Sequence, residues 1–161
     1  HVHIAMAPTK NIDRTEWFVE KATEIGFDEM TFLNCRFSER KNINMDRIEK
    51  IVVSAMKQSR KSEMPMLNSM VRFEDFVKRQ FSGDKFICHC YEEAELDNKI
   101  LLRDALLDSD DAVVLVGPEG DFSIDEVKLA IEHGFHSVSL GNSRLRTETA
   151  ALVAVHLMRL K

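Results

Sequence analysis

The sequence has no long apolar segment and no secretory signal. Its 161 residues are 44% hydrophobic and 30% charged, but no apolar run approaches the roughly 18 residues that a membrane span requires. These absences argue against a membrane protein. The length and composition predict one globular domain, residues 1–161, that is large enough to bury a core.

Cysteine is scarce, and no metal-binding spacing is present. Cys35, Cys88 and Cys90 cannot all pair, and no Cys-x-x-Cys motif occurs. Five further candidate metal ligands have no metal-like spacing: His3, His89, His133, His136 and His156. We therefore expect buried free thiols in a reducing cytoplasm, and no metal site.

The net charge of −5 argues against a wholly basic surface for RNA. Between residues 36 and 61, however, eight Lys and Arg face three acidic residues. Such a local excess can neutralise phosphates whatever the overall charge. It can equally be a solvated helix face with ion pairs along the helix. The sequence leaves both interpretations open.

Strand-like and helix-like segments alternate along the chain. Strands are predicted at 1–7, 30–35, 66–71, 85–91, 112–116 and 137–140. Helices are predicted at 13–26, 45–59, 73–80, 123–134 and 150–160, with 100–107 either a helix or a connector. The alternation of strands and helices indicates an α/β fold around a parallel sheet.

Helix boundaries follow from capping residues. Asp13 with Glu16, and Ser123 with Glu126, have the spacing of capping boxes. Thr147 or a neighbour is expected to cap the last helix, which is apolar on almost every side and should therefore be buried.

Two glycine-bearing turns each follow a short apolar strand. Gly117-Pro118-Glu119-Gly120 follows the apolar strand at 112–116, and Gly141 follows Leu140 at the end of the next. In an open parallel sheet such turns lie at the edge where ligands bind, and glycine allows close approach to the backbone. Neither a P-loop nor a GxGxxG motif is present. The turns suit a flat base with a ribose, although two tight structural turns would look the same.

A polar segment precedes the last helix. Residues 144–149 read RLRTET, with two arginines where the helix dipole disfavours them. A carboxylate of a substrate or cofactor, or an RNA phosphate, would explain these cations.

These motifs carry a resemblance to a known family. VGPEGDFS, a glycine-bounded helix and VSLGNSRLRTETAA resemble the C-terminal signature of SPOUT-class methyltransferases. More closely, they resemble the bacterial family that methylates N3 of a uracil in small-subunit (16S) ribosomal RNA. Four earlier stretches agree with it, namely APTK, EWFVEKATEIG, SERK and AMKQSRK. Two positions depart from the family pattern: Asp121 replaces a frequent glycine, and Asn142-Ser143 replaces a commoner proline-containing pair.

The resemblance implies a parallel-sheet SPOUT fold with a deep C-terminal trefoil knot, S-adenosylmethionine as the methyl donor, and a homodimer. Family members usually carry an N-terminal PUA-like β-barrel, which is absent here. We therefore expect the true N-terminus of the protein to lie upstream of His1. By the same resemblance, the cofactor site consists of Leu115, Val116, Gly117, Glu119, Gly120, Leu140, Gly141, Leu145, Arg146, Thr147, Thr149 and Ala150.

The resemblance also suggests roles in catalysis. Arg146 is expected to stabilise the negative charge that develops on the base. Glu148 could assist proton removal, or could equally be an ion-pair partner. The RNA backbone is expected to contact Arg40, Arg60 and Arg144.

Two other functions stay open on the sequence alone. A related SPOUT enzyme could act on a ribose 2′-hydroxyl or on transfer RNA. Alternatively, the chain could be a non-catalytic RNA-binding module with the same fold.

Overall fold

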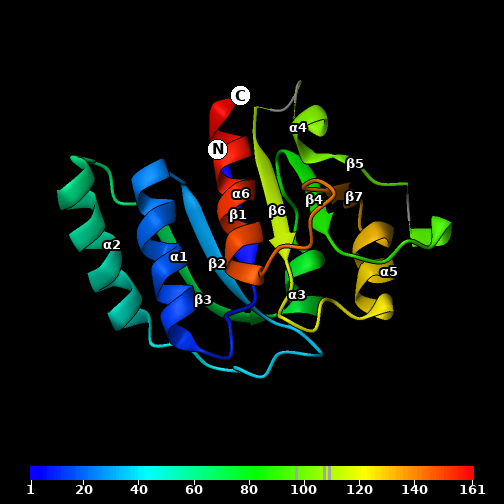
Figure 1. Ribbon diagram of the computed structural model, residues 1–161, viewed down its shortest axis with the longest axis horizontal. Helices are drawn as coiled ribbons and strands as arrows, with labels where there is room; N and C mark the ends of the chain where they lie inside the picture. The colour runs from blue at the N-terminus through cyan, green and yellow to red at the C-terminus, as the bar shows by residue number, and fades with distance from the viewer. Residues whose placement is uncertain (97, 107, 109) are drawn as a thin grey trace.

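The computed structural model describes residues 1–96, 98–106, 108 and 110–161. A sheet of seven strands runs through it in the order β3-β2-β1-β6-β4-β7-β5, and every neighbouring pair is parallel (Figure 1). The strands are β1 Val2–Met6, β2 Glu29–Asn34, β3 Met66–Arg72, β4 Asp84–Cys88, β5 Ile100–Leu101, β6 Ala112–Val116 and β7 His136–Ser139. The predicted α/β fold with a parallel sheet is confirmed.

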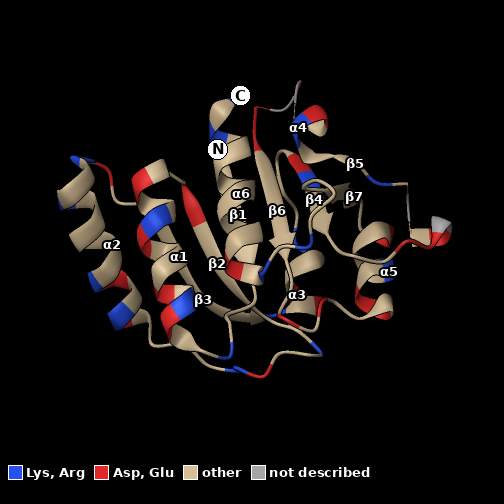
Figure 2. Ribbon diagram, viewed as in Figure 1, with Lys and Arg blue, Asp and Glu red and all other residues tan. Residues whose placement is uncertain are grey.

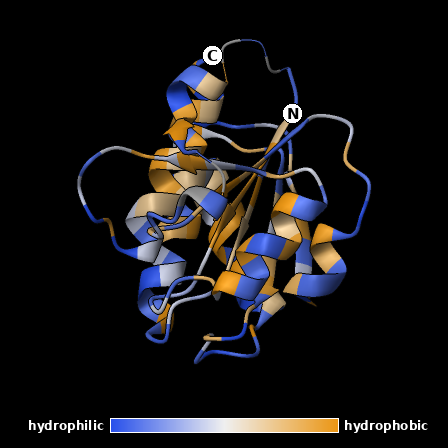
Figure 3. Cartoon of the chain, turned by 90° about the vertical axis from the view of Figure 1, so that its right-hand side faces the viewer, coloured by the Kyte–Doolittle hydropathy of each residue, from blue (hydrophilic) through white to orange (hydrophobic). Residues whose placement is uncertain are grey.

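Helices cover both faces of the sheet. They are α1 Ile12–Ile25, α2 Met45–Ser59, α3 Phe73–Val77, α4 Leu102–Ala105, α5 Ile124–Glu132 and α6 Thr147–Leu160, with a 3-10 turn at Ala94–Leu96. One core joins α1, α2, α4 and α6 to one face of the sheet, and a second core joins α3 and α5 to the other. Figure 3 shows the apolar strands between these two helical layers.

The centre of the sheet is apolar because both of its faces are covered. All five residues of β6 are buried between β1 and β4, as the continuous apolar run at 112–116 predicts. Side chains alternate along β6, so Val114 and Val116 enter the first core, whereas Val113 and Leu115 enter the second.

The predicted cap of α1 is wrong, and α6 begins three residues earlier than the predicted position 150. Asn11, not Asp13, caps α1, and its side chain accepts a hydrogen bond from the Asp13 N–H at 3.0 Å. The last helix begins at Thr147, and its N-cap, Arg146, makes no capping hydrogen bond with its side chain. The capping box of Ser123 and Glu126 is present as predicted.

Helix α6 is less buried than its composition suggests. One side packs on the first core through Ala151, Ala154, Val155 and Met158. The other side is partly accessible, and Leu160 at its end is 67% exposed. The expected burial of this helix is therefore confirmed for one side only.

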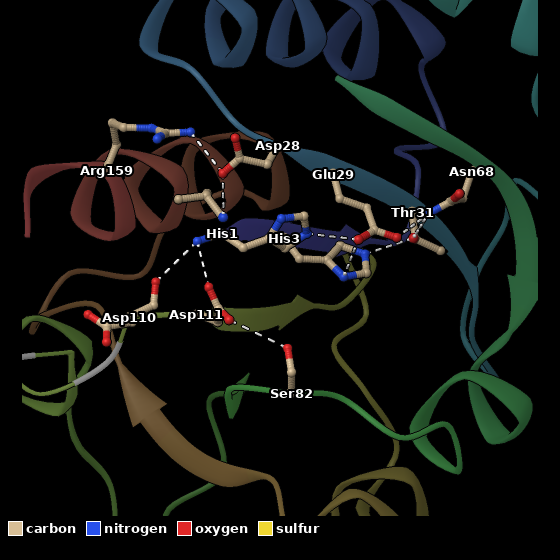
Figure 4. Close-up of polar contacts among 11 residues, drawn as sticks. His1, His3, Asp28, Glu29, Thr31, Asn68, Ser82, Asp110, Asp111 and Arg159 are labelled. Carbon is tan, nitrogen blue, oxygen red and sulfur yellow. Dashed lines mark hydrogen bonds and ion pairs between the residues drawn. The ribbon is translucent and has the colours of Figure 1, made fainter. Parts of the chain in front are cut away.

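A polar network joins β1, β2 and β3 at the amino ends of the strands (Figure 4). His3 is buried and contacts the Thr31 hydroxyl at 2.8 Å, and that hydroxyl also accepts from the Asn68 amide at 2.9 Å. Glu29 accepts from Asn68 at 2.8 Å and lies 3.5 Å from His3 Nδ1. Nearby, the Asp28 carboxylate binds both the Val2 N–H and Arg159. The network fixes this end of the sheet, opposite the edge with the glycine turns.

The remaining expectations concern connecting segments and thiols. The segment expected to be a helix or connector contains β5 and α4, and its last residue, Leu107, lies outside the described residues. The acidic residues 92–98, between β4 and β5, contain the 3-10 turn, and Asp97 among them also lies outside the described residues. The three cysteines are free, but only Cys35 is fully buried, whereas Cys88 is partly accessible and Cys90 is exposed. Along the described parts of the chain, no helix has the length and apolar content needed to cross a membrane.

Candidate functional site

A cleft of about 550 Å³ lies at the carboxyl ends of β4, β6 and β7. This is the edge where open parallel sheets bind ligands. One wall is the turn after β6, a second is the segment from the end of β7 to the start of α6, and a third is the end of β4 with the residues that follow it.

Most of the predicted cofactor residues meet in this cleft. Its lining includes Val116, Gly117, Glu119, Leu140, Gly141, Leu145, Arg146, Thr147 and Ala150. Three others lie elsewhere. Leu115 is fully buried in the second core. Gly120 faces Phe37. A β-carbon added at position 120 would lie 3.3 Å from the Phe37 β-carbon. Thr149 is in the first turns of α6 and does not line the cleft.

One buried hydrogen bond joins the two glycine-turn segments. The Thr147 hydroxyl donates to the carbonyl oxygen of Gly117 at 3.1 Å. Thr147 is therefore not a cap for its own helix but a tie to the turn after β6. Gly117 has little room on its other side, because a β-carbon there would lie 3.0 Å from the Phe122 nitrogen. A side chain at 117 would therefore disturb Phe122.

The turn after β6 explains one departure from the family pattern. Asp121 has a φ of 69°, a backbone conformation that favours glycine and that Asp tolerates better than most residues. Its carboxylate accepts from the Phe122 N–H at 2.7 Å and from the Cys90 N–H at 2.9 Å. The Tyr91 hydroxyl donates to the Phe122 carbonyl at 2.6 Å. The aspartate thus stabilises the turn and ties it to the segment after β4.

The third wall of the cleft was not predicted. It includes Cys88, His89 and Lys99. Burial raises the pKa of the Cys88 thiol to about 12, with a further contribution from the charge of Asp121. Cys88 is therefore a neutral, weakly reactive thiol. The strand predicted at 85–91 was the available signal, because its carboxyl end had to lie at the same edge of the sheet.

His89 is held in a neutral form within this wall. Burial lowers its pKa, and the positive charge of Lys99 lowers it further. Its Nδ1 accepts from the Tyr91 N–H at 3.2 Å, and its Nε2 lies 2.8 Å from the Ser137 hydroxyl. Since that hydroxyl donates to the Leu96 carbonyl at 2.7 Å, the network assigns the ring proton to Nε2. His89 is therefore a structural link between β7 and the cleft.

The two predicted catalytic residues have different surroundings. Arg146 is exposed at the rim of the cleft, and its guanidinium has no hydrogen-bond or ion-pair partner among the described residues. Glu148 is buried, and its carboxylate lies 3.3 Å from Arg14 Nη1 on α1. This geometry favours the ion-pair role of Glu148 that the sequence left open.

Glu119 lies between the cleft and a second hollow. Its carboxylate accepts a hydrogen bond from the Lys10 N–H at 2.9 Å, which ties the turn after β6 to the loop after β1. Glu119 and Arg146 line both the cleft and the neighbouring hollow, which has a volume of about 530 Å³.

The three arginines predicted to contact RNA are not equivalent. Arg40 is half-buried, and its guanidinium donates to the carbonyls of Thr9 at 3.0 Å and Lys10 at 2.7 Å. Arg60 is exposed at the end of α2, and Arg144 is exposed and lines the cleft. Figure 2 shows cations along α2 and the loop before it. Within the described residues, no three His, Cys, Asp or Glu side chains are grouped to hold a metal ion.

Comparison with known proteins defines the class. The RNA methyltransferase domain family matches residues 1–159, and the chain belongs to this family. Within that class it is similar to Ribosomal RNA small subunit methyltransferase E of Rickettsia conorii. The two are 30% identical over 149 residues, which cover 92% of this chain and 60% of that protein. The chain spans about three fifths of the length of the first curated relatives it matches.

Solved structures agree with this assignment. A probable rRNA-methyltransferase from Porphyromonas gingivalis is 39% identical, with a TM-score of 0.87, and the match covers 99% of this chain and 68% of that one. A methyltransferase from Legionella pneumophila, solved with bound SAM, is 30% identical with a TM-score of 0.87, and the match covers 99% of this chain and 65% of that one. The family resemblance of the sequence is thereby confirmed.

Proposed function

We propose that this chain is the catalytic domain of an S-adenosylmethionine-dependent methyltransferase that acts on N3 of a uridine in 16S ribosomal RNA. The observation that carries the proposal is the cleft whose two glycine-turn segments are joined by the bond from Thr147 to Gly117. The Legionella relative binds SAM, and the curated relatives are named for small-subunit ribosomal RNA. A ribosomal substrate would place the protein in the cytoplasm.

The cleft suits the cofactor chemically. Val116, Val138, Leu140 and Ala150 offer apolar surface for a flat base. The glycine turns expose backbone groups for hydrogen bonds to the base and ribose, as close approach to the backbone requires. When bound, S-adenosylmethionine supplies an electrophilic methyl group on a sulfonium sulfur.

The reaction forms a bond from uracil N3 to the methyl carbon, breaks the sulfonium S–CH3 bond, and releases the N3 proton to solvent or a base. Arg146 at the rim of the cleft would stabilise the negative charge on the uracil as N3 loses its proton. Glu148 holds Arg14 and so would fix the start of α6 rather than take the proton. Alignment of the two reactants would then supply much of the rate.

Product analysis tests this reaction. Small-subunit ribosomal RNA that lacks the modification is incubated with the protein and S-adenosylmethionine, and the nucleosides are separated by mass spectrometry. The proposal predicts 3-methyluridine. A ribose 2′-O-methylated nucleoside, or methylation of transfer RNA alone, would contradict this activity. Either result would instead indicate a related SPOUT enzyme with another target. A folded, cofactor-binding protein without any product on RNA would favour a non-catalytic module.

We also propose that two copies of the chain associate through α6. Five residues on its partly accessible face are spaced three or four apart or adjacent, so they lie on one side of the helix. They are Leu152, Val153, His156, Leu157 and Leu160. An apolar stripe of this kind is typical of a protein interface. Light scattering is expected to give the mass of a dimer, and Leu160→Glu is expected to weaken it. A monomer at all concentrations would contradict the proposal.

We further propose that the C-terminal segment forms the deep trefoil knot implied by the resemblance. The chain leaves β7, passes β4, and packs α6 on β1 and β6, while Thr147 is tied to Gly117 (Figure 1). This path brings the start of α6 close to the turn after β6, while the end of α6 lies at the amino ends of the strands, where Arg159 contacts Asp28. An experimental structure traced through residues 112–161 tests the proposal, and an unthreaded path would refute it.

A further inference from the structure

The second hollow lies directly beside the cleft. It is lined by Lys10, Asn11, Arg14, Glu119, Arg146 and Glu148, which come from the loop after β1, the start of α1, the turn after β6 and the start of α6. Glu119 and Arg146 form the ridge shared by both cavities. A molecule in the hollow would therefore lie next to whatever occupies the cleft.

The hollow carries one more positive than negative charge. It contains three cations against two carboxylates. Both carboxylates already have partners, because Glu148 pairs with Arg14 at 3.3 Å and Glu119 accepts from the Lys10 N–H at 2.9 Å. Arg146, by contrast, has no such partner among the described residues.

Lys10 can change its partner at little cost. Its ammonium lies 3.6 Å from Glu39, but the two side chains are 76% and 64% exposed. Exposed pairs of this kind contribute little to stability, so a phosphate could replace Glu39. The main chain of Lys10 is fixed by the Glu119 carboxylate and by Arg40, which donates to its carbonyl. The exposed ammonium is therefore carried by an anchored backbone.

We propose that this hollow binds the phosphate next to the target nucleoside of the RNA, with Lys10 and Arg146 as its contacts. Arg14 also lines the hollow, but its charge is paired with the buried Glu148. With the phosphate in the hollow, the base crosses the ridge at Glu119 and Arg146 toward the cleft. The inference rests on the proposed function and assigns the substrate contacts of that same site. It gives Lys10 a binding role that its sequence position did not suggest.

The first test measures RNA affinity against salt. A short single-stranded RNA that contains uridine is titrated in the presence of S-adenosylhomocysteine, with Lys10→Ala and, as the matched control, Lys128→Ala. Lys128 is an exposed lysine on α5, outside both cavities. Loss of one phosphate contact is expected to weaken binding about three- to tenfold. The decrease of log K with log salt is expected to become shallower by about 0.7. Equal affinities and slopes for the two variants would overturn the proposal.

The second test locates the phosphate. Amide resonances are followed while uridine 5′-monophosphate, or uridine without phosphate, is added to the protein saturated with S-adenosylhomocysteine. The proposal predicts shifts at residues 10, 11 and 146 that are larger with the phosphate. Shifts confined to other residues, or none, would overturn it.

The two proposals fail in different ways. If the unmodified protein does not bind S-adenosylhomocysteine, the proposed function fails first. If it binds the cofactor product but Lys10→Ala behaves like Lys128→Ala, only the phosphate site is wrong. Lys10→Ala is expected to keep its affinity for S-adenosylhomocysteine, because Lys10 does not line the cleft.

Discussion

The hydroxyl of Thr147 donates a hydrogen bond to the carbonyl of Gly117, over 3.1 Å and thirty positions along the chain. Thr147 is the first residue of α6, and Gly117 is the first residue after β6. Both are buried and both line the cleft. This bond therefore holds together the two segments that the sequence marks with glycine turns.

Replacing Thr147 with valine tests the importance of this bond. Thr147→Val keeps the shape of the side chain but leaves the buried Gly117 carbonyl without its donor. We expect a loss of about 1–2 kcal/mol in the free energy of unfolding and weaker binding of S-adenosylhomocysteine. Urea unfolding and calorimetry measure the two effects. Thr149→Val, two residues along the same helix and outside the cleft, is the matched control, and equal effects in both variants would contradict the account.

The pair of Arg14 and Glu148 is expected to behave as a coupled unit. Arg14→Met leaves the buried Glu148 carboxylate without its charge partner, so it should destabilise the fold by roughly 1–3 kcal/mol. In the double variant Arg14→Met/Glu148→Gln, part of that loss should be recovered. Urea unfolding of the two single variants and the double variant gives the coupling energy. Strictly additive losses would show that the 3.3 Å contact does not stabilise the start of α6.

Arg146 is expected to act on the reaction and not on the fold. Because it is exposed at the cleft rim, Arg146→Ala should leave the unfolding free energy within about 0.5 kcal/mol. Affinity for S-adenosylhomocysteine should stay within a few-fold, while methylation of ribosomal RNA should fall by about a hundredfold or more. Radiolabelled methyl transfer measures the rate. Normal turnover by this variant would remove Arg146 from the mechanism.

The network around His3 predicts a pH dependence of stability. Burial lowers the pKa of His3 from 6.5 to about 4, partly offset by Glu29 and reinforced by Arg79. The folded state therefore keeps His3 neutral, while the unfolded chain takes up a proton below pH 6.5. Stability should be complete above that pH and fall as the pH drops toward 4, by up to about 3 kcal/mol.

Urea unfolding at pH 7 and pH 5 measures this effect. His3→Gln removes the titrating ring and should flatten the difference between the two pH values. His136→Gln, at an exposed position on β7, should leave it as it is in the unmodified protein. If the His3 variant keeps the full pH dependence, other groups must be responsible.

Local patterns predicted the elements of the fold well. The apolar run at 112–116 is the buried central strand β6, and the capping box of Ser123 and Glu126 opens α5. The cap of α1 was mispredicted and that of α6 was left between Thr147 and a neighbour, because several neighbouring polar residues can cap a helix and only tertiary contacts select one. Thr147 has the residue type of a cap, but its hydroxyl is used by Gly117 instead.

The cleft could be predicted only in part, for a topological reason. Motifs after β6 and β7 marked two of its walls. The wall with Cys88, His89 and Lys99 depends on β4 lying between β6 and β7. Local sequence patterns do not determine the order of strands in a sheet. The side chain of Leu115 does not line the cleft, because alternation along β6 turns it toward the second core.

The central claim is that this chain holds a site for S-adenosylmethionine. Calorimetric titration with S-adenosylhomocysteine tests it most directly, because this product binds the same cleft without reacting. The account predicts saturable binding of about one ligand per chain, weakened by Thr147→Val. A folded sample that takes up no S-adenosylhomocysteine would contradict it.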